Sequence, residues 1–141
     1  SIPAAKIAAI KRAAPEVFVN ARVDSYWFHE DDTVEAVRER AKAYADAGAD
    51  CLYAPGIKTR EEITAVVKAV HPKPVNLLIG ASGLSLREAG ELGVRRISVG
   101  GSLARMAWSG FMRAAREMAE QGTFTELAGG YPGGELNKMF A

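Results

Sequence analysis

The sequence predicts an α/β fold of short parallel strands alternating with helices, as in a four-stranded Rossmann-like sheet or half of a (β/α)8 barrel. Two observations predict it: a repeated succession of strand, loop and helix, and regular signals at the helix ends. The absence of a G-x-G-x-x-G phosphate fingerprint between strand and helix argues against the Rossmann-like alternative. The expected strands are Val17–Val23, Cys51–Ala54, Val75–Ile79 and Arg96–Val99. The expected helices are Thr33–Ala47, Arg60–Val70, Leu86–Leu92 and Leu103–Gln121.

A helix is also expected before the first strand. The chain opens with SIPAAKIAAIKRAAPE, in which Ile2, Ala5, Ala9 and Ile10 follow a helical period. Because the chain starts on this period and without a methionine, we expect it to begin inside a larger architecture.

Start signals precede three of the four later helices, and stop signals follow three of the four. A capping residue stands three positions before a glutamate in the pairs Asp32 and Glu35, Thr59 and Glu62, and Ser85 and Glu88. In such a capping box the two side chains satisfy free amides at the helix start. Glycines that suit a left-handed helix end occur at Gly48, Gly93 and Gly122. The repetition of both signals supports the predicted boundaries.

The composition excludes several classes of partner. The 141 residues are 48% hydrophobic and 25% charged, with a formal net charge of +1. Basic and acidic residues are interleaved, so we expect neither nucleic acid nor an anionic membrane as a partner. No apolar run approaches the ~20 residues that span a bilayer. The single cysteine, Cys51, suits a reducing compartment, and we expect a cytoplasmic protein.

The stretch FVNARVDSYW contains polar side chains at alternate positions of an otherwise apolar strand. Phe18, Asn20, Arg22 and Asp24 share one face, which becomes polar toward the carboxyl end of the strand. In a barrel this is the end where active sites are built. We therefore expect Asp24 and Asn20 to hold Arg22 so that its planar fork binds a carboxylate or phosphoryl group.

The alternative is an internal salt bridge along one strand that binds nothing, although burying an arginine costs several kcal/mol. Asn76, on the third expected strand, is a further candidate for substrate binding if its side chain faces the interior; a shift of register turns it outward. Ser82 and Gly83 follow in the next loop, where they either contact a ligand or form a simple turn.

Several motifs together resemble the isocitrate lyase/phosphoenolpyruvate mutase family. They are NARVD at a strand end, then KPVNLL, LGVRRISVGGSLAR and ELNKMF, in this order. The resemblance extends over nearly the whole chain and implies the C-terminal half of a (β/α)8 barrel. It implies a single domain over residues 1–141, with about four βα units, a C-terminal helix and a tail.

The resemblance also implies a chemistry. In this family Mg2+ holds a small α-keto or dicarboxylic acid while a carbon–carbon or carbon–phosphorus bond is made or broken. Arg22 matches the family arginine that grips the acidic group of the substrate. The metal ligands and the catalytic lysine and cysteine belong to the other half of the barrel, so we expect no catalytic or metal-binding residue here and no activity of this chain alone.

Three positions depart from the family pattern. Val23 replaces the threonine of the usual Ala-Arg-Thr-Asp motif, which should matter little because its side chain points toward the helices. Pro55 stands where the lyases carry a glutamate and the phosphonate mutases a histidine, and proline cannot exchange a proton. Leu78 aligns approximately with a substrate-binding asparagine of the lyases. The identity of the substrate therefore does not follow from the resemblance. A non-catalytic structural or oligomerisation module is the alternative function.

The segment Leu103–Gln121 has two apolar stripes, whereas a helix on a monomeric barrel needs only one. The first consists of Leu103, Met106, Gly110, Phe111, Ala114 and Met118, and the second of Trp108, Met112, Ala115 and Ala119. We expect a homo-oligomer, a dimer or tetramer, assembled through this helix, and the resemblance implies its exchange between subunits. Alternatively, the C-terminal tail covers the wide stripe.

Overall fold

The computed structural model describes residues 2–80 and 83–141. The chain divides into two compact units, Ser1–Val99 and Gly100–Ala141. The first unit contains a sheet with its helices, and the second contains three helical segments. The prediction of a single domain over residues 1–141 stays a prediction.

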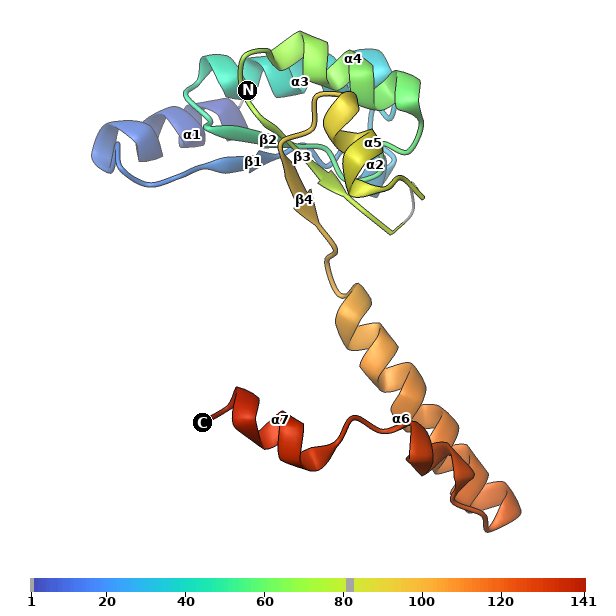
Figure 1. Ribbon diagram of the computed structural model, residues 1–141. Coiled ribbons are helices and arrows are strands. Elements are labelled where there is room, and N and C mark those ends of the chain that lie inside the picture. Colours follow the sequence, from blue (N-terminus) through green and yellow to red (C-terminus); the bar gives the residue numbers. More distant parts are fainter. Residues whose placement is uncertain (1, 81–82) are drawn as a thin grey trace. The chain divides into compact units, whose positions relative to one another are not determined.

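Four parallel strands form the sheet of the first unit, in the order in which they occur in the sequence (Figure 1). They are β1 (Asn20–Arg22), β2 (Cys51–Tyr53), β3 (Val75–Leu78) and β4 (Arg96–Ser98). A sequential parallel order is that of a (β/α)8 barrel, whereas the strand order of a Rossmann sheet reverses at a switch point. The predicted α/β fold class, half of such a barrel, is therefore confirmed.

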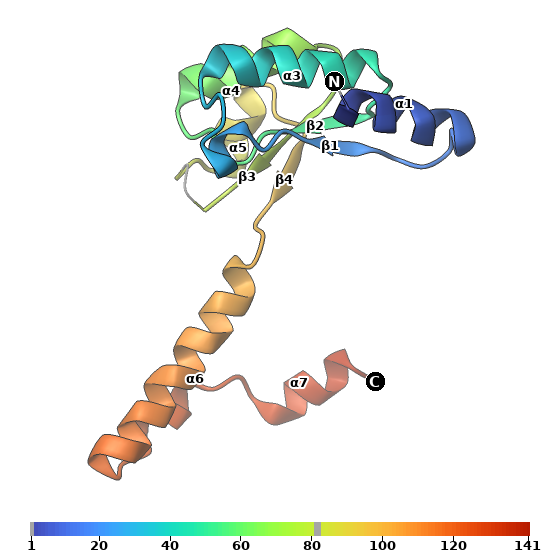
Figure 2. The ribbon, with the colours of Figure 1, turned by 180° about the vertical axis from the view of Figure 1, so that it is seen from behind.

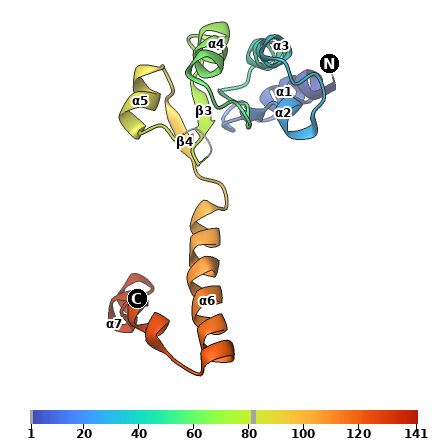
Figure 3. The ribbon, with the colours of Figure 1, turned by 90° about the vertical axis from the view of Figure 1, so that its right-hand side faces the viewer.

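One face of the sheet carries the hydrophobic core. The helices of this unit are α1 (Ile2–Ala13), α2 (Ser25–Phe28), α3 (Val34–Asp46), α4 (Arg60–Val70) and α5 (Leu86–Glu91). Helix α3 packs on β2 and α4, helix α4 packs on β3, and α1 packs on α3. Seen from behind (Figure 2) and from the side (Figure 3), α3 and α4 lie together on this one side of the sheet.

The side chains that fill this core alternate along the strands, as expected for a sheet covered on one face. From the strands come Ala21, Val23, Leu52, Ala54, Val75 and Leu77, and from the two large helices Val37, Ala41, Tyr44, Ile63, Val66 and Val70. Each fully buried valine, leucine or isoleucine contributes about 1.5–3 kcal/mol by leaving water. The core therefore fixes which strand residues face away from the helices.

Two of the three predicted capping boxes are confirmed. Thr59 with Glu62 begins α4, and Ser85 with Glu88 begins α5. The third prediction is wrong by one residue, because Thr33 caps α3 by accepting a hydrogen bond from the amide of Ala36. Asp32 instead pairs with His29 Nδ1 at 3.4 Å. The predicted glycines Gly48, Gly93 and Gly122 all have positive φ at the helix ends.

Strand β1 is shorter than predicted. Val17 is 46% exposed and the strand begins only at Asn20. The carboxylate of Asp50 explains the difference, because it accepts bonds from the amide of Val19 (2.8 Å) and from Lys11 Nζ (3.0 Å). The amide of Val19 therefore bonds a side chain, while its carbonyl oxygen still accepts from the amides of Asp50 and Cys51.

The predicted first helix is present as α1, but it buries a different face from the one the period suggested. Ile2 and Ile10 are exposed, and Ile7 is the residue of α1 that enters the core. Ala4 packs beside Ile7 at the margin of the core. Alanines on every side of this helix obscure the buried face in the sequence.

The second unit contains α6 (Ser102–Gln121), a 3-10 helix η1 (Thr125–Gly129) and α7 (Gly133–Met139). One buried carboxylate, Glu117, joins α6 to η1. It accepts hydrogen bonds from the Thr125 hydroxyl, from the Thr123 hydroxyl (2.7 Å) and from the amides of Thr125 and Glu126 (both 2.8 Å). These bonds lower the pKa of Glu117 to about 2.

Most large apolar side chains of α6 are exposed. They include Leu103, Met106, Trp108, Phe111 and Met112. The rings of Trp108 and Phe111 meet edge to face, with centroids 5.3 Å apart. Among the described residues, no helix is both long enough and apolar enough to cross a membrane.

Candidate anion-binding site

The polar side chains lie on the face of the sheet opposite the core. Arg22 is paired with Tyr53, Tyr53 with Asn76, and Asn76 with Arg96 across the parallel ladder. Residues paired in register, and residues two apart along a strand, point to the same side of a sheet. We define the inner face as the side that carries this row, and it is the side away from α3 and α4.

Arg22 lies at the carboxyl end of β1, where its guanidinium is held on three sides. Its Nε donates a hydrogen bond to Oδ1 of Asp24. The guanidinium carbon lies 5.5 Å from the ring centroid of Trp27 and 5.7 Å from that of Tyr53. Such distances are within the range of cation–π attraction. The two side chains of the salt bridge are 44% and 35% exposed, so water and solutes reach them.

The bond to Asp24 uses Nε and leaves the end of the guanidinium free. Neither terminal nitrogen of Arg22 has a hydrogen-bond partner among the described residues. These two nitrogens form the fork that binds carboxylate and phosphate groups through two parallel bonds. The arrangement therefore offers an oriented, partly desolvated cation to a planar anion.

Asn20 does not hold Arg22, contrary to the prediction for that residue. Its Oδ1 is buried and has no hydrogen-bond partner among the described residues. Instead of Asn20, the rings of Trp27 and Tyr53 help Asp24 to hold Arg22, through cation–π contacts. Strand alternation could have placed Tyr53 on the inner face, because it stands two positions after Cys51 in β2. Trp27 could not be found in this way, because α2 is too short to show a helical period.

Asn76 faces the inner side, as the strand alternation required. It is only 1% exposed, and both ends of its amide are used. Its Nδ2 donates to Oγ of Ser98 (3.0 Å), and its Oδ1 accepts from Nη1 of Arg96 (2.8 Å). The sequence analysis did not identify Arg96 and Ser98, although their spacing of two residues places both on one face.

Cys51 also lies on the inner face, in register with Asn20. It is fully buried, and burial raises the pKa of its thiol. A raised pKa keeps the sulfur protonated and weakly nucleophilic. The cysteine is therefore a packing residue.

The loop after β2 supports the short helix that carries Trp27. Gly56 has a φ of +107°, and a Cβ atom built there would lie 2.5 Å from Cβ of Tyr26. Tyr26 in turn donates from its hydroxyl to Oε1 of Glu62 at 3.2 Å. Burial and the Glu62 carboxylate raise the pKa of Tyr26 to about 12. Pro55 is buried in the same loop.

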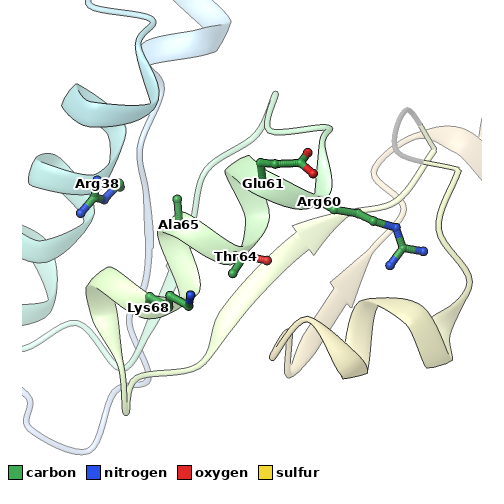
Figure 4. Close-up of a pocket in the computed structure, with 6 residues that line it drawn as sticks. All are labelled: Arg38, Arg60, Glu61, Thr64, Ala65 and Lys68. Atoms are coloured by element: carbon green, nitrogen blue, oxygen red, sulfur yellow. The ribbon is translucent and has the colours of Figure 1, made fainter.

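One hollow lined by described residues lies away from this site. It is a groove of about 420 Å3 between α3 and α4, lined by Arg38, Arg60, Glu61, Thr64, Ala65 and Lys68 (Figure 4). Figure 4 shows Arg60 extending away from Lys68, and its guanidinium pairs with Glu88. Arg38 pairs with Glu35 at 2.6 Å. Its cations therefore do not converge on one point, and the groove lies on the helix side of the sheet.

The remaining predicted positions add little to the site. Ser82 lies outside the described residues, and Gly83 is exposed. Within residues 2–80 and 83–141, no group of three or more His, Cys, Asp or Glu side chains is placed to hold a metal ion.

Comparison with known proteins identifies the family of this chain. The family model for phosphoenolpyruvate phosphomutase matches residues 2–119. Two uncharacterized proteins from strains of Mycobacterium tuberculosis are 44% identical over 100 residues, which are 71% of this chain and 38% of theirs. The chain thus spans well under half the length of these relatives.

Solved structures agree with this assignment. A protein of Burkholderia cenocepacia J2315, provisionally named a lyase/mutase, is 44% identical, with a TM-score of 0.89 over 98% of this chain and 51% of that one. A 2,3-dimethylmalate lyase of the PEP mutase/isocitrate lyase superfamily is 27% identical, with a TM-score of 0.68 over 86% of this chain and 43% of that one. Since the family model covers most of the sequence, the chain belongs to the phosphoenolpyruvate mutase/isocitrate lyase family.

Proposed function

We propose that the complete protein is a lyase or mutase that acts on small α-keto or dicarboxylic acids, and that this chain supplies the anion-binding half of its active site. Membership of a family of lyases and mutases supports the enzyme class. The unpartnered fork of Arg22 at the carboxyl end of β1 is the observation that carries the proposal. Active sites of (β/α)8 barrels form at this end of the strands.

Asp24 and the two rings have defined roles in this proposal. Asp24 fixes Nε and compensates part of the charge, which lowers the cost of keeping the guanidinium at a partly buried position. Trp27 and Tyr53 restrict the plane of the guanidinium and exclude water from its sides. The acidic group of the substrate then completes the coordination through the two terminal nitrogens.

Mg2+ is proposed as the cofactor of the complete protein on the family resemblance alone. Its ligands are expected outside this chain, because the described residues do not fit a metal site. Turnover by the complete protein should be lost with EDTA and restored by MgCl2. Full activity in the presence of the chelator would contradict the cofactor assignment.

The proton transfers of the proposed reaction also belong to residues outside this chain. Pro55 is buried after β2 and carries no exchangeable proton, while burial keeps the thiol of Cys51 protonated. On the inner face, the contribution of this chain is therefore to bind and orient an anion.

Replacement of Arg22 in the complete protein tests the proposal. Arg22→Ala should weaken binding of oxalate about 30-fold or more, since loss of a charged hydrogen-bonding partner costs about 2 kcal/mol or more. Arg22→Lys should restore only part of the affinity, because it keeps the charge without the fork. Isothermal titration calorimetry measures both, with Arg87→Ala on α5 as a control for an exposed arginine that pairs with Glu91.

Unchanged oxalate binding by Arg22→Ala would contradict the enzyme proposal. It would favour the alternative, a non-catalytic module that retains the half-barrel and the long helix without chemistry. The buried Pro55 and the absence of a metal-binding cluster among the described residues favour this alternative.

We propose further that the complete protein forms a homo-oligomer, a dimer or tetramer, through α6. The apolar side chains of Trp108 and Phe111, with Ala104 and Ala107, border a hollow of about 350 Å3 that no described residue of this unit fills. Exchange of this helix between subunits, which the family resemblance implies, would bury both apolar stripes at once.

A further inference from the structure

Arg96 places a second guanidinium on the inner face, and we infer that it forms a second anion-binding point that selects ligands with two acidic groups. This inference rests on the proposed function, because it requires that Arg22 binds the first acidic group. It adds a residue that the sequence analysis did not single out. It also assigns Asn76 a different role from direct substrate contact.

The hydrogen bonds of Asn76 support this assignment. Its amide is buried, and each end is used by a neighbour on β4: Ser98 accepts from Nδ2, and Arg96 donates to Oδ1. The bond to the Ser98 hydroxyl fixes which end of the amide faces Arg96. A buried amide whose polar atoms are both satisfied has little capacity left for a substrate. Asn76 is therefore a positioning residue that aims Arg96.

Arg96 itself is only partly satisfied. Its bond to Asn76 uses Nη1, the side chain is exposed, and it forms no salt bridge with any described residue. Asp24 is the only carboxylate among the described inner-face positions of the four strands and their ends, and it pairs with Arg22. In the complete barrel the other half would cover this face, and a guanidinium buried there needs a counter-charge, which we assign to an acidic group of the ligand.

The register sets the distance between the two arginines. Arg22 and Arg96 occupy the same row of the ladder and are separated by two strands, β2 and β3. With neighbouring strands ~4.8 Å apart, their backbones lie about 14 Å apart along the sheet. Two long side chains that extend into one interior reduce this separation toward the span of a small diacid. A monoacid occupies only one of the two points.

A pair of ligands that differ by one carboxylate tests the inference. In the complete protein, Arg96→Gln should weaken binding of succinate about ten-fold and change binding of butyrate less than two-fold. Glutamine keeps an N–H donor for Asn76 but removes the charge, which limits damage to the fold. Asn76→Leu should cause the same selective loss, because it releases Arg96 without removing its charge.

Arg95→Gln is the matched control. Arg95 is the adjacent residue of the same charge, but its guanidinium donates to the carbonyl oxygens of Gly90 and Val94. This control should bind both ligands as the wild type does. Calorimetric titration gives the ratio of the two dissociation constants, a quantity that a general loss of folded protein does not change.

Two results would overturn the inference. One is a wild-type protein that binds succinate no more tightly than butyrate, and the other is an Arg96→Gln protein whose preference for succinate is unchanged. Failure of the proposed function gives a different pattern, in which Arg22→Ala leaves the binding of both ligands intact. Arg96→Lys provides a second variant if the glutamine variant does not fold, and it should retain more of the preference than glutamine.

Discussion

At the scale of single residues, the site depends on which nitrogens of the Arg22 guanidinium bond the protein and which stay available to a ligand. The hydrogen bond to Asp24 and the rings of Trp27 and Tyr53 use Nε and the sides of Arg22. Only the terminal nitrogens are left for an anion. The strand alternation predicted Arg22 and Asp24 correctly as neighbours, because two residues on one face of a strand must lie close together.

The aromatic contact gives a prediction at the same scale. Trp27→Leu should weaken oxalate binding by the complete protein about two- to five-fold, since a cation–π contact at an exposed site contributes about 0.5–1 kcal/mol. Trp27→Phe should lose less, because a ring remains over the guanidinium. Calorimetry measures both variants, and equal affinities for leucine and phenylalanine at this position would contradict a role for the ring.

Sequence reasoning could not separate the roles of Asn20 and Asn76. Both are asparagines on strands whose side chains face the same side of the sheet. The partner of each is decided by neighbouring strands that are far away in sequence: Ser98 and Arg96 lie about 20 residues after Asn76. Such pairings depend on the register between neighbouring strands, which the sequence of one strand alone does not determine.

At the scale of elements, local signals predicted helices better than strands. Capping residues and glycines mark helix ends through short-range geometry, so the boundaries of α4 and α5 were close. The start of α3 was displaced by one residue, because Asp32 and Thr33 are both suitable caps. Helix α2 was missed, since four residues are too few to show a period.

The contact between Gly56 and Tyr26 gives a prediction about these elements. Gly56→Ala should destabilise the protein by about 2–4 kcal/mol, because it combines a positive φ with an overlap against Tyr26. It should also weaken oxalate binding, because Tyr26 precedes Trp27 in α2. Chemical denaturation and calorimetry provide the two measurements.

Gly83→Ala is the control for this change. Gly83 also has a positive φ, but nothing lies within 4 Å of a Cβ atom built there. It should cost only about 1–2 kcal/mol, the penalty of the left-handed conformation. Equal destabilisation by the two substitutions would show that the contact with Tyr26 is unimportant.

The turn between α6 and η1 should respond to acid. Hydrogen bonds from Thr125, Thr123 and Glu126 lower the pKa of Glu117 to about 2, below its ordinary value of 4.5. The carboxylate therefore stabilises the folded turn fully above about pH 4.5, and this contribution is lost as the pH falls toward 2. The protection factor of the Thr125 amide, which is corrected for the intrinsic pH dependence of exchange, should fall across this range, and Glu117→Gln should remove this loss of protection. Unchanged protection between pH 5 and pH 2 would contradict the assignment.

At the scale of the whole molecule, the fold class and family were predicted correctly because the motifs occur in a fixed order along the chain. The division into two units was not predicted. Periodicity identifies a helix with two apolar stripes, but it does not reveal what covers them. Trp108 is 63% exposed, and the proposed assembly through α6 would cover it.

Assembly gives the prediction at this scale. Trp108→Glu should shift the complete protein toward smaller species in size-exclusion chromatography with light scattering, because a buried charge is costly at an apolar interface. Arg116→Glu on the same helix is the control for a charge change. If both variants keep the mass of the wild type, α6 is not the assembly surface.

The central claim is that the terminal nitrogens of Arg22 bind the acidic group of a ligand. A crystal structure of the complete protein with oxalate tests it directly. We expect two hydrogen bonds of about 2.7–2.9 Å between those nitrogens and one carboxylate, with Asp24 still bonded to Nε. Oxalate bound elsewhere, or a protein carboxylate occupying the fork of Arg22, would contradict the account.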